Sequence, residues 1–144
     1  MKILIDTSAL VAALVVSHPH HSRAFPWLMK AKEQEIELLI SSHTIAELYA
    51  VLSTLPVSPR ITTSLAWRLI HESVLAYATV TALSSSDYQL AIKRMSELGI
   101  SGGAVYDALI AKAAQKAGVD RILTFNVTDF KRVWPEGAAY IAAP

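Results

Sequence analysis

The chain has 144 residues, of which 53 % are apolar and none is cysteine, and its formal net charge is +1. This length fits one domain with a single core, which we place at residues 1–144. The lack of cysteine excludes disulfide and thiolate chemistry and favours a cytoplasmic protein. The small net charge excludes a large basic surface for nucleic acid. No apolar run reaches the roughly 18 residues that span a membrane.

Strand-like and helix-like segments alternate along the chain. The apolar run before Asp6 predicts a strand buried on both faces, and a helix capped by Thr7 or Ser8 follows to about residue 16. Further strands are predicted at residues 37–41, 78–83 and 121–124, with a short edge strand at 139–141, and further helices at 22–34, 42–55, 59–76, 87–98 and 104–117. This order predicts an α/β fold in which a mainly parallel sheet of four to five strands is covered by helices on both faces.

Four acidic residues stand apart from other charges in the sequence: Asp6, Glu47, Asp107 and Asp129. Each follows a different predicted strand or loop near one edge of the predicted sheet, and ligands bind at the carboxyl edge of open α/β sheets. Carboxylates gathered there would repel one another unless a divalent cation lay among them. Oxygen ligands suit Mg²⁺ or Mn²⁺. The four acids together therefore indicate a metal site, although each alone could be structural.

Four segments resemble the successive motifs of PIN-domain ribonucleases. They are ILIDTSAL at residues 3–10, TIAEL at 44–48, YDALIA at 106–111 and LTFNVTDF at 123–130. The resemblance extends over nearly the whole chain in motif order and spacing, and it is strongest to the VapC toxins of bacterial and archaeal toxin–antitoxin pairs. It implies an α/β/α sandwich, an endoribonuclease that depends on Mg²⁺ or Mn²⁺, and a cognate antitoxin that blocks the site.

The resemblance also assigns roles to individual residues. Asp6, Glu47 and Asp107 match the metal-binding acids of the family. The fourth position departs from the family pattern, because many members have an acid where this chain has Asn126, and the nearest carboxylate is Asp129. We expect all four acids to be catalytic and to hold the metal directly or through water, with Asp129 and Asn126 orienting water.

Two hydroxyl groups lie beside the proposed ligands in the sequence. Ser8 and Thr124 are, with Asn126, candidates to fix the carboxylates by hydrogen bonds. The alternative for Ser8 is a helix cap, and the alternative for Thr124 is a hydrogen bond at the end of a strand.

Partner contacts are less defined in the sequence. The histidines of residues 18–21 are typical of a solvated turn, and Arg23 is one of several scattered cations that could contact RNA phosphates or simply solvate a surface. The apolar helices at residues 46–55 and 65–76 could form a homodimer or an antitoxin surface. Loops at 18–23 and 101–103 are the expected sites of RNA specificity.

Two other enzyme classes also place an Asp at the end of the first strand. A haloacid-dehalogenase phosphotransferase needs a second Asp two residues later, where this chain has Ser8, and a receiver domain needs an acidic pair before the end of that strand. Neither pattern is present. A degenerate PIN-like module that only binds RNA or protein remains an alternative because of Asn126.

Overall fold

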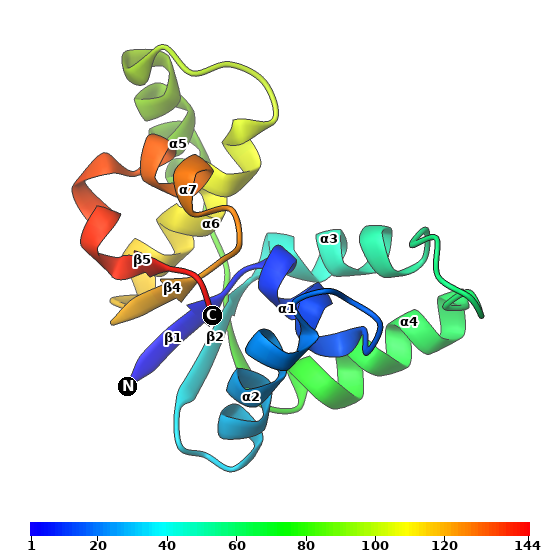
Figure 1. Cartoon of the computed structure of the whole chain (residues 1–144). Coiled ribbons are helices and arrows are strands. Elements are labelled where there is room, and N and C mark those ends of the chain that lie inside the picture. The colour runs from blue at the N-terminus through cyan, green and yellow to red at the C-terminus, as the bar shows by residue number, and fades with distance from the viewer.

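The computed structural model describes all of residues 1–144 and contains one parallel sheet (Figure 1). Its strands are β1 (Lys2–Ile5), β2 (Glu37–Ser41), β3 (Ala78–Thr81), β4 (Arg121–Leu123) and β5 (Ile141–Ala142), in the spatial order β3-β2-β1-β4-β5. Every neighbouring pair is parallel. The predicted α/β class is confirmed, with five strands.

Helices cover both faces of this sheet. One layer contains α1 (Thr7–Leu14), α2 (His21–Lys32), α3 (Ser42–Leu52) and α4 (Thr63–Ile70), which continues as the π-helical turn η1 (His71–Leu75). The other layer contains α5 (Ser85–Leu98), α6 (Ala104–Ala117) and α7 (Val127–Val133), followed by the 3₁₀-helix η2 (Pro135–Tyr140). Figure 1 shows the two groups on opposite sides of the strands.

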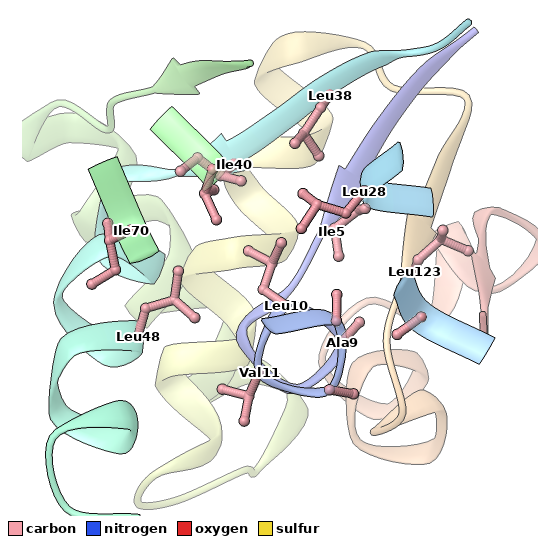
Figure 2. Packing of buried hydrophobic residues seen from close by; sticks show 14 of the residues in the cluster. Ile5, Ala9, Leu10, Val11, Leu28, Leu38, Ile40, Leu48, Ile70 and Leu123 are labelled. Atoms are coloured by element: carbon pink, nitrogen blue, oxygen red, sulfur yellow. The ribbon is translucent and has the colours of Figure 1, made fainter. Parts of the chain in front are cut away.

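The core is divided between the two faces because successive residues of a strand point to opposite sides. Ile3 and Ile5 of the central strand pack with the α1–α4 layer, whereas Leu4 packs with the α5–α7 layer. Figure 2 shows the first of these clusters, with Ile5 and Leu38 from the sheet opposite Leu10 of α1. Because β1 is buried from both sides, the residue that follows it also starts in a buried position.

Several element boundaries differ from the sequence prediction. The first helix ends at Leu14, and the long helix predicted from residue 59 begins at Thr63, where Thr62 accepts a hydrogen bond from the Leu65 N–H. The helix α7 and the turn η2 were not predicted, because each is too short for a clear helical period. The edge strand is shifted to Ile141–Ala142.

None of the helices has the length and apolar character that crossing a membrane would require.

Candidate active site

The candidate site begins at Asp6, the residue directly after the central strand. Its side chain is only 2 % exposed, and no basic side chain forms an ion pair with it. Instead, Oδ1 accepts hydrogen bonds from the Ala9 N–H at 3.0 Å and the Ser8 hydroxyl at 2.8 Å. Oδ2 accepts one from the Thr124 hydroxyl at 2.7 Å. Burial raises the pKa of Asp6 from 3.8 to about 6, and these hydrogen bonds partly oppose the increase.

The cap of α1 is Asp6 itself, so the prediction that Thr7 or Ser8 would cap this helix is wrong. The strand runs into the helix without a loop, which leaves the Asp6 carboxylate within reach of the Ala9 N–H. The Ser8 hydroxyl is therefore available to the carboxylate, and it also accepts a hydrogen bond from the Phe125 N–H at 3.1 Å.

Thr124 follows β4, which pairs with β1 in the sheet. Its buried hydroxyl donates to Asp6 and accepts a hydrogen bond from the Asn126 N–H at 2.9 Å. The sequence offered two alternatives for Thr124, a hydrogen bond at the end of a strand and support of a site carboxylate. The Thr124 hydroxyl lies at the end of β4 and donates to Asp6, so both descriptions apply to it. Pairing of the two strands places residues 6 and 124 side by side.

Glu47 reaches the same edge of the sheet from α3, which begins directly after β2. Its Oε1 accepts a hydrogen bond from the Thr7 hydroxyl at 2.9 Å, and the Nε2 atom of His43 lies 3.6 Å from the same oxygen. Thr7 follows Asp6 in the sequence, so its hydrogen bond to Glu47 keeps Glu47 close to Asp6.

Asp107 lies in the first turn of α6, on the other layer of helices. The pKa of its carboxyl group is raised from 3.8 to about 6, first by burial and then by the negative charges of Asp6, Asp129 and Glu47. Asp107 thus lies within electrostatic range of all three other predicted acids. Residues from four separate segments of the chain share one negatively charged site.

The fourth position is divided between Asn126 and Asp129, at the start of α7. Asn126 precedes the helix and makes no capping hydrogen bond with its side chain, whereas Asp129 lies in the first turn. Only Asp129 can contribute negative charge, and it does so at Asp107. Both side chains are exposed.

The donor set of this site fits a hard divalent cation. Its charged groups are carboxylates, and their mutual repulsion at Asp107 is the kind that a cation relieves. No group of three or more acids or histidines is placed to ligate one ion directly. Mg²⁺ commonly binds through one or two carboxylates and keeps several waters, so the arrangement fits Mg²⁺ with part of its shell supplied by water.

Comparison with known proteins identifies the family of the chain. The PIN-domain family model matches residues 3–134. The chain belongs to the PIN-domain family. Ribonuclease VapC27 of Mycobacterium tuberculosis is 34 % identical to this PIN domain over 110 residues, which are 76 % of this chain and 74 % of the relative. Ribonuclease VapC40 of the same organism is 30 % identical over 119 residues, which are 83 % of this chain and 82 % of the relative.

Solved structures show the same fold. The VapBC2 structure from Rickettsia felis, bound to a promoter DNA fragment, matches with a TM-score of 0.68 and 21 % identity over 100 % of this chain and 99 % of that chain. The Mycobacterium tuberculosis VapC20 toxin, described as cleaving the sarcin–ricin loop, matches with a TM-score of 0.66 and 14 % identity over 83 % and 86 % of the two chains. At these identities the likeness concerns the fold alone.

Three residues at or beside the site of this PIN domain were not among the predicted site residues: Thr7, His43 and Tyr106. Thr7 donates to Glu47, and its place next to Asp6 was the available signal. His43 lies one helical turn before Glu47, and its ring stacks on Tyr106 with 5.0 Å between centroids. Tyr106 immediately precedes Asp107, so this stack connects α3 to the start of α6.

A cavity of about 460 Å³ lies away from these acids, between α5, α6 and the end of α7. Its walls combine apolar groups such as Met95 and Trp134 with charges of both signs, including Lys112 and Glu97. None of the four predicted metal ligands lines it. The acidic site is therefore at the sheet edge and not in this hollow.

Proposed function

We propose that this PIN domain is an endoribonuclease that depends on Mg²⁺ or Mn²⁺ and acts as the toxin of a VapBC-type toxin–antitoxin pair. The observation that supports this most strongly is the electrostatic coupling of Asp107 to Asp6, Glu47 and Asp129. A site with this much concentrated negative charge favours a cation, and phosphodiester hydrolysis is a reaction that such cations assist.

The four acids would have different roles in metal binding, which follow from their surroundings. Asp6 is held by three hydrogen-bond donors and would provide a fixed carboxylate, whereas Glu47, Asp107 and Asp129 are more accessible and would complete the site directly or through water. When bound, the divalent cation supplies positive charge that offsets the charge developing on the phosphoryl oxygens and makes the attacking water more acidic.

The neighbouring polar groups would position these ligands. Ser8 and Thr124 hold the two oxygens of Asp6, and Thr7 holds Glu47 through Oε1. The Asn126 N–H donates to the Thr124 hydroxyl, and we propose that its amide side chain orients water beside Asp129. Such supporting hydrogen bonds commonly change metal affinity or activity about 10- to 100-fold when removed.

The proposed partners follow from the relatives and from the exposed surface. Two relatives are named ribonucleases, and the Rickettsia felis neighbour is a VapBC assembly, so RNA and a cognate antitoxin are the proposed substrate and partner. On α3 and α4, Tyr49, Leu65 and Trp67 are large exposed apolar side chains. We propose that they contribute to an antitoxin contact or to a homodimer.

The direct test is cleavage of a panel of structured and unstructured RNAs by purified protein, with Mg²⁺ or Mn²⁺ and with chelator. We expect discrete products only with metal, and none from the Asp107→Asn variant. Glu72→Gln is the matched control. This exposed acid lies in η1, and its variant should cleave like the unchanged protein.

Metal-dependent stabilisation separates this proposal from the alternative of a degenerate module that only binds RNA or protein. A functional site should gain thermal stability with Mn²⁺, because a ligand that binds only the folded state stabilises it. RNA binding without cleavage and without stabilisation by Mn²⁺ would instead support the degenerate module.

A further inference from the structure

The backbone of Phe125 lies beside the acidic site. It follows Thr124, whose hydroxyl donates to Asp6, and its own N–H donates to the Ser8 hydroxyl at 3.1 Å. Ser8 in turn donates to Asp6 at 2.8 Å. The backbone of Phe125 is therefore fixed by the same hydrogen-bonded group that holds the buried carboxylate.

The Phe125 ring is part of a stacked cluster with the loop that precedes α2. The His20 ring stacks on it with 4.7 Å between centroids and 21° between planes, and the His18 ring lies at 6.5 Å and 24°. The guanidinium carbon of Arg23 lies 5.5 Å from the centroid of the same phenyl ring. We refer to His18, His20, Arg23 and Phe125 as the ring cluster.

The ring cluster has an inner side and an outer side. Phe125 is half-buried and packs against the hydrophobic core of the α1–α4 layer, and His18 is also half-buried. His20 and Arg23 are exposed. The cluster therefore presents an imidazole ring and a guanidinium group to solvent on a support that the core holds in place.

Hydrogen bonds inside the ring cluster favour a neutral His18. Its Nδ1 atom accepts a hydrogen bond from the His20 N–H at 3.0 Å, so the proton of the neutral ring lies on Nε2. Burial and the neighbouring charges of His20 and His21 lower the pKa of His18 from its usual 6.5. The His18 ring is tilted against the His20 ring, with 5.9 Å between centroids and 45° between planes, so the two rings are neighbours on the face of Phe125.

The outer groups of the ring cluster form no ion pair with an Asp or Glu side chain. None of the ion pairs of the structure includes His20 or Arg23. Arg23 donates from Nε and Nη2 to the backbone oxygen of Pro144, which fixes the guanidinium plane and leaves its Nη1 hydrogens without a protein acceptor in the structure. Such a fixed, planar cation is well suited to a phosphate oxygen.

We propose that the ring cluster is a nucleotide subsite, in which an unstacked RNA base stacks on His20 and Arg23 contacts an adjacent phosphate. The inference rests on the proposed function, because it places this nucleotide beside the phosphodiester bond to be cut at the four acids. Exposed rings bind single-stranded RNA through the faces of its bases, and this contact tolerates different base identities. The subsite thus selects single-stranded segments and loops at the cleavage position.

The test measures binding of short fluorescein-labelled single-stranded RNA by fluorescence anisotropy, in the Asp107→Asn background with Mg²⁺ so that the RNA stays intact. Oligouridylate, oligoadenylate and an abasic oligomer of equal length are compared. His20→Ala should weaken binding of the two base-bearing RNAs about 5- to 100-fold and leave the abasic oligomer unchanged, because one stacked base is lost. His20→Phe, which restores a ring, should recover most of this affinity.

Arg23→Ala tests the phosphate contact separately. It should weaken binding of base-bearing and abasic oligomers alike and reduce the salt dependence of binding, because one phosphate contact is lost. His71→Ala and Arg68→Ala are the matched controls: the His71 ring also packs against an aromatic ring, Trp67, and Arg68 is an exposed arginine, but Arg68 lies on α4 and His71 on η1. Neither control should change RNA binding.

The outcomes distinguish the subsite from the nuclease. If the unchanged protein cleaves RNA and His20→Ala neither weakens binding nor slows cleavage, the subsite is overturned and the nuclease stands. If His20→Ala selectively weakens base-bearing RNA while the unchanged protein cleaves none, the subsite is supported and the nuclease is overturned. Failure of every oligomer to bind would overturn the subsite, and cleavage of the RNA panel by the unchanged protein would still decide the nuclease.

Discussion

Asp6 and Asp107 are both carboxylates whose pKa is raised to about 6, yet their surroundings are opposite. Asp6 at the end of β1 is surrounded by hydrogen-bond donors, which oppose the effect of burial. Asp107 at the start of α6 accepts no hydrogen bond at its carboxylate and is instead near the other acids, whose negative charges add to the effect of burial. Hydrogen bonds from the surrounding residues hold the Asp6 carboxylate, whereas the negative charges of the neighbouring acids repel the Asp107 carboxylate.

The difference indicates two kinds of contribution to one function. The donors at Asp6 fix the position of its oxygens whether or not a cation is present. Asp6 therefore stabilises the fold and is also a proposed metal ligand. The repulsion between Asp107 and the other acids is reduced only when a cation binds or Asp107 takes up a proton. Without either, this repulsion destabilises the folded protein. Substitutions at the two positions should therefore behave differently.

The largest expected effect is on RNA cleavage. Asp6→Asn and Asp107→Asn should each lower the rate by more than about a hundredfold, because about a hundredfold is the upper end of the loss when only a group that supports a metal ligand is removed. Asp6→Glu should be as inactive as Asp6→Asn, because the longer side chain does not fit the buried position. Asp107→Glu should keep measurable activity, because its site is partly open. Equal activity of the two Glu variants in a cleavage time course would contradict the comparison.

Binding of Mn²⁺ should give the next largest effect. At a hundredfold excess over the dissociation constant, a cation that binds only the folded protein adds about 2.7 kcal/mol to the free energy of unfolding. We expect this increase for the unchanged protein and for the Glu72→Gln control, and a much smaller one for Asp107→Asn. Thermal denaturation with Mn²⁺ and with chelator measures it, and an equal increase in all three proteins would show that the cation binds elsewhere.

Removal of a donor from Asp6 should destabilise the protein without metal. Thr124→Val leaves one oxygen of a buried carboxylate without its hydroxyl partner, and such a loss costs about 1–3 kcal/mol. Thr128→Val, at an exposed position of α7, is the matched control and should change the free energy of unfolding by less than about 0.5 kcal/mol. Urea denaturation in chelator measures both, and similar values would mean that the Thr124 hydroxyl does not support Asp6.

Removal of charge from Asp107 should have the smaller and opposite effect. A carboxyl group whose pKa is raised on folding stabilises the folded state most below the unfolded value of 3.8 and loses that contribution as the pH rises to about 6. Asp107→Asn should therefore be more stable than the unchanged protein above pH 6 in chelator, on the order of 1–2 kcal/mol after allowance for solvent screening.

This gain should vanish near pH 4, where the carboxyl group of the unchanged protein is protonated in the folded state. Urea denaturation at pH 4 and at pH 7.5 compares the two proteins, with Glu72→Gln as the control. A gain of equal size at both pH values would mean that packing, and not charge repulsion, is responsible.

Local order was already determined by the sequence. The apolar run of residues 2–5 gave the central strand, the Ser84 and Asp87 pair gave the capping box of α5, and Gly99 ended that helix in the left-handed conformation that glycine favours. The sequence also marked Asp6, Glu47, Asp107 and Asp129 as candidates, because each stands apart from other charged residues. These features depend on residues within a few positions of one another, so their pattern is visible in the chain itself.

The tertiary structure alone decided which groups meet. Thr124 donates to Asp6 because β4 pairs with β1, and the His20 ring reaches Phe125 because the loop before α2 lies beside the end of β4. Strand order and helix packing bring together residues that are more than a hundred positions apart in sequence, and no local period encodes such a pairing. The sequence by itself therefore indicated which acids are candidates for the site. The tertiary structure decided that Asp6 is surrounded by hydrogen-bond donors and that Asp107 lies near other negative charges.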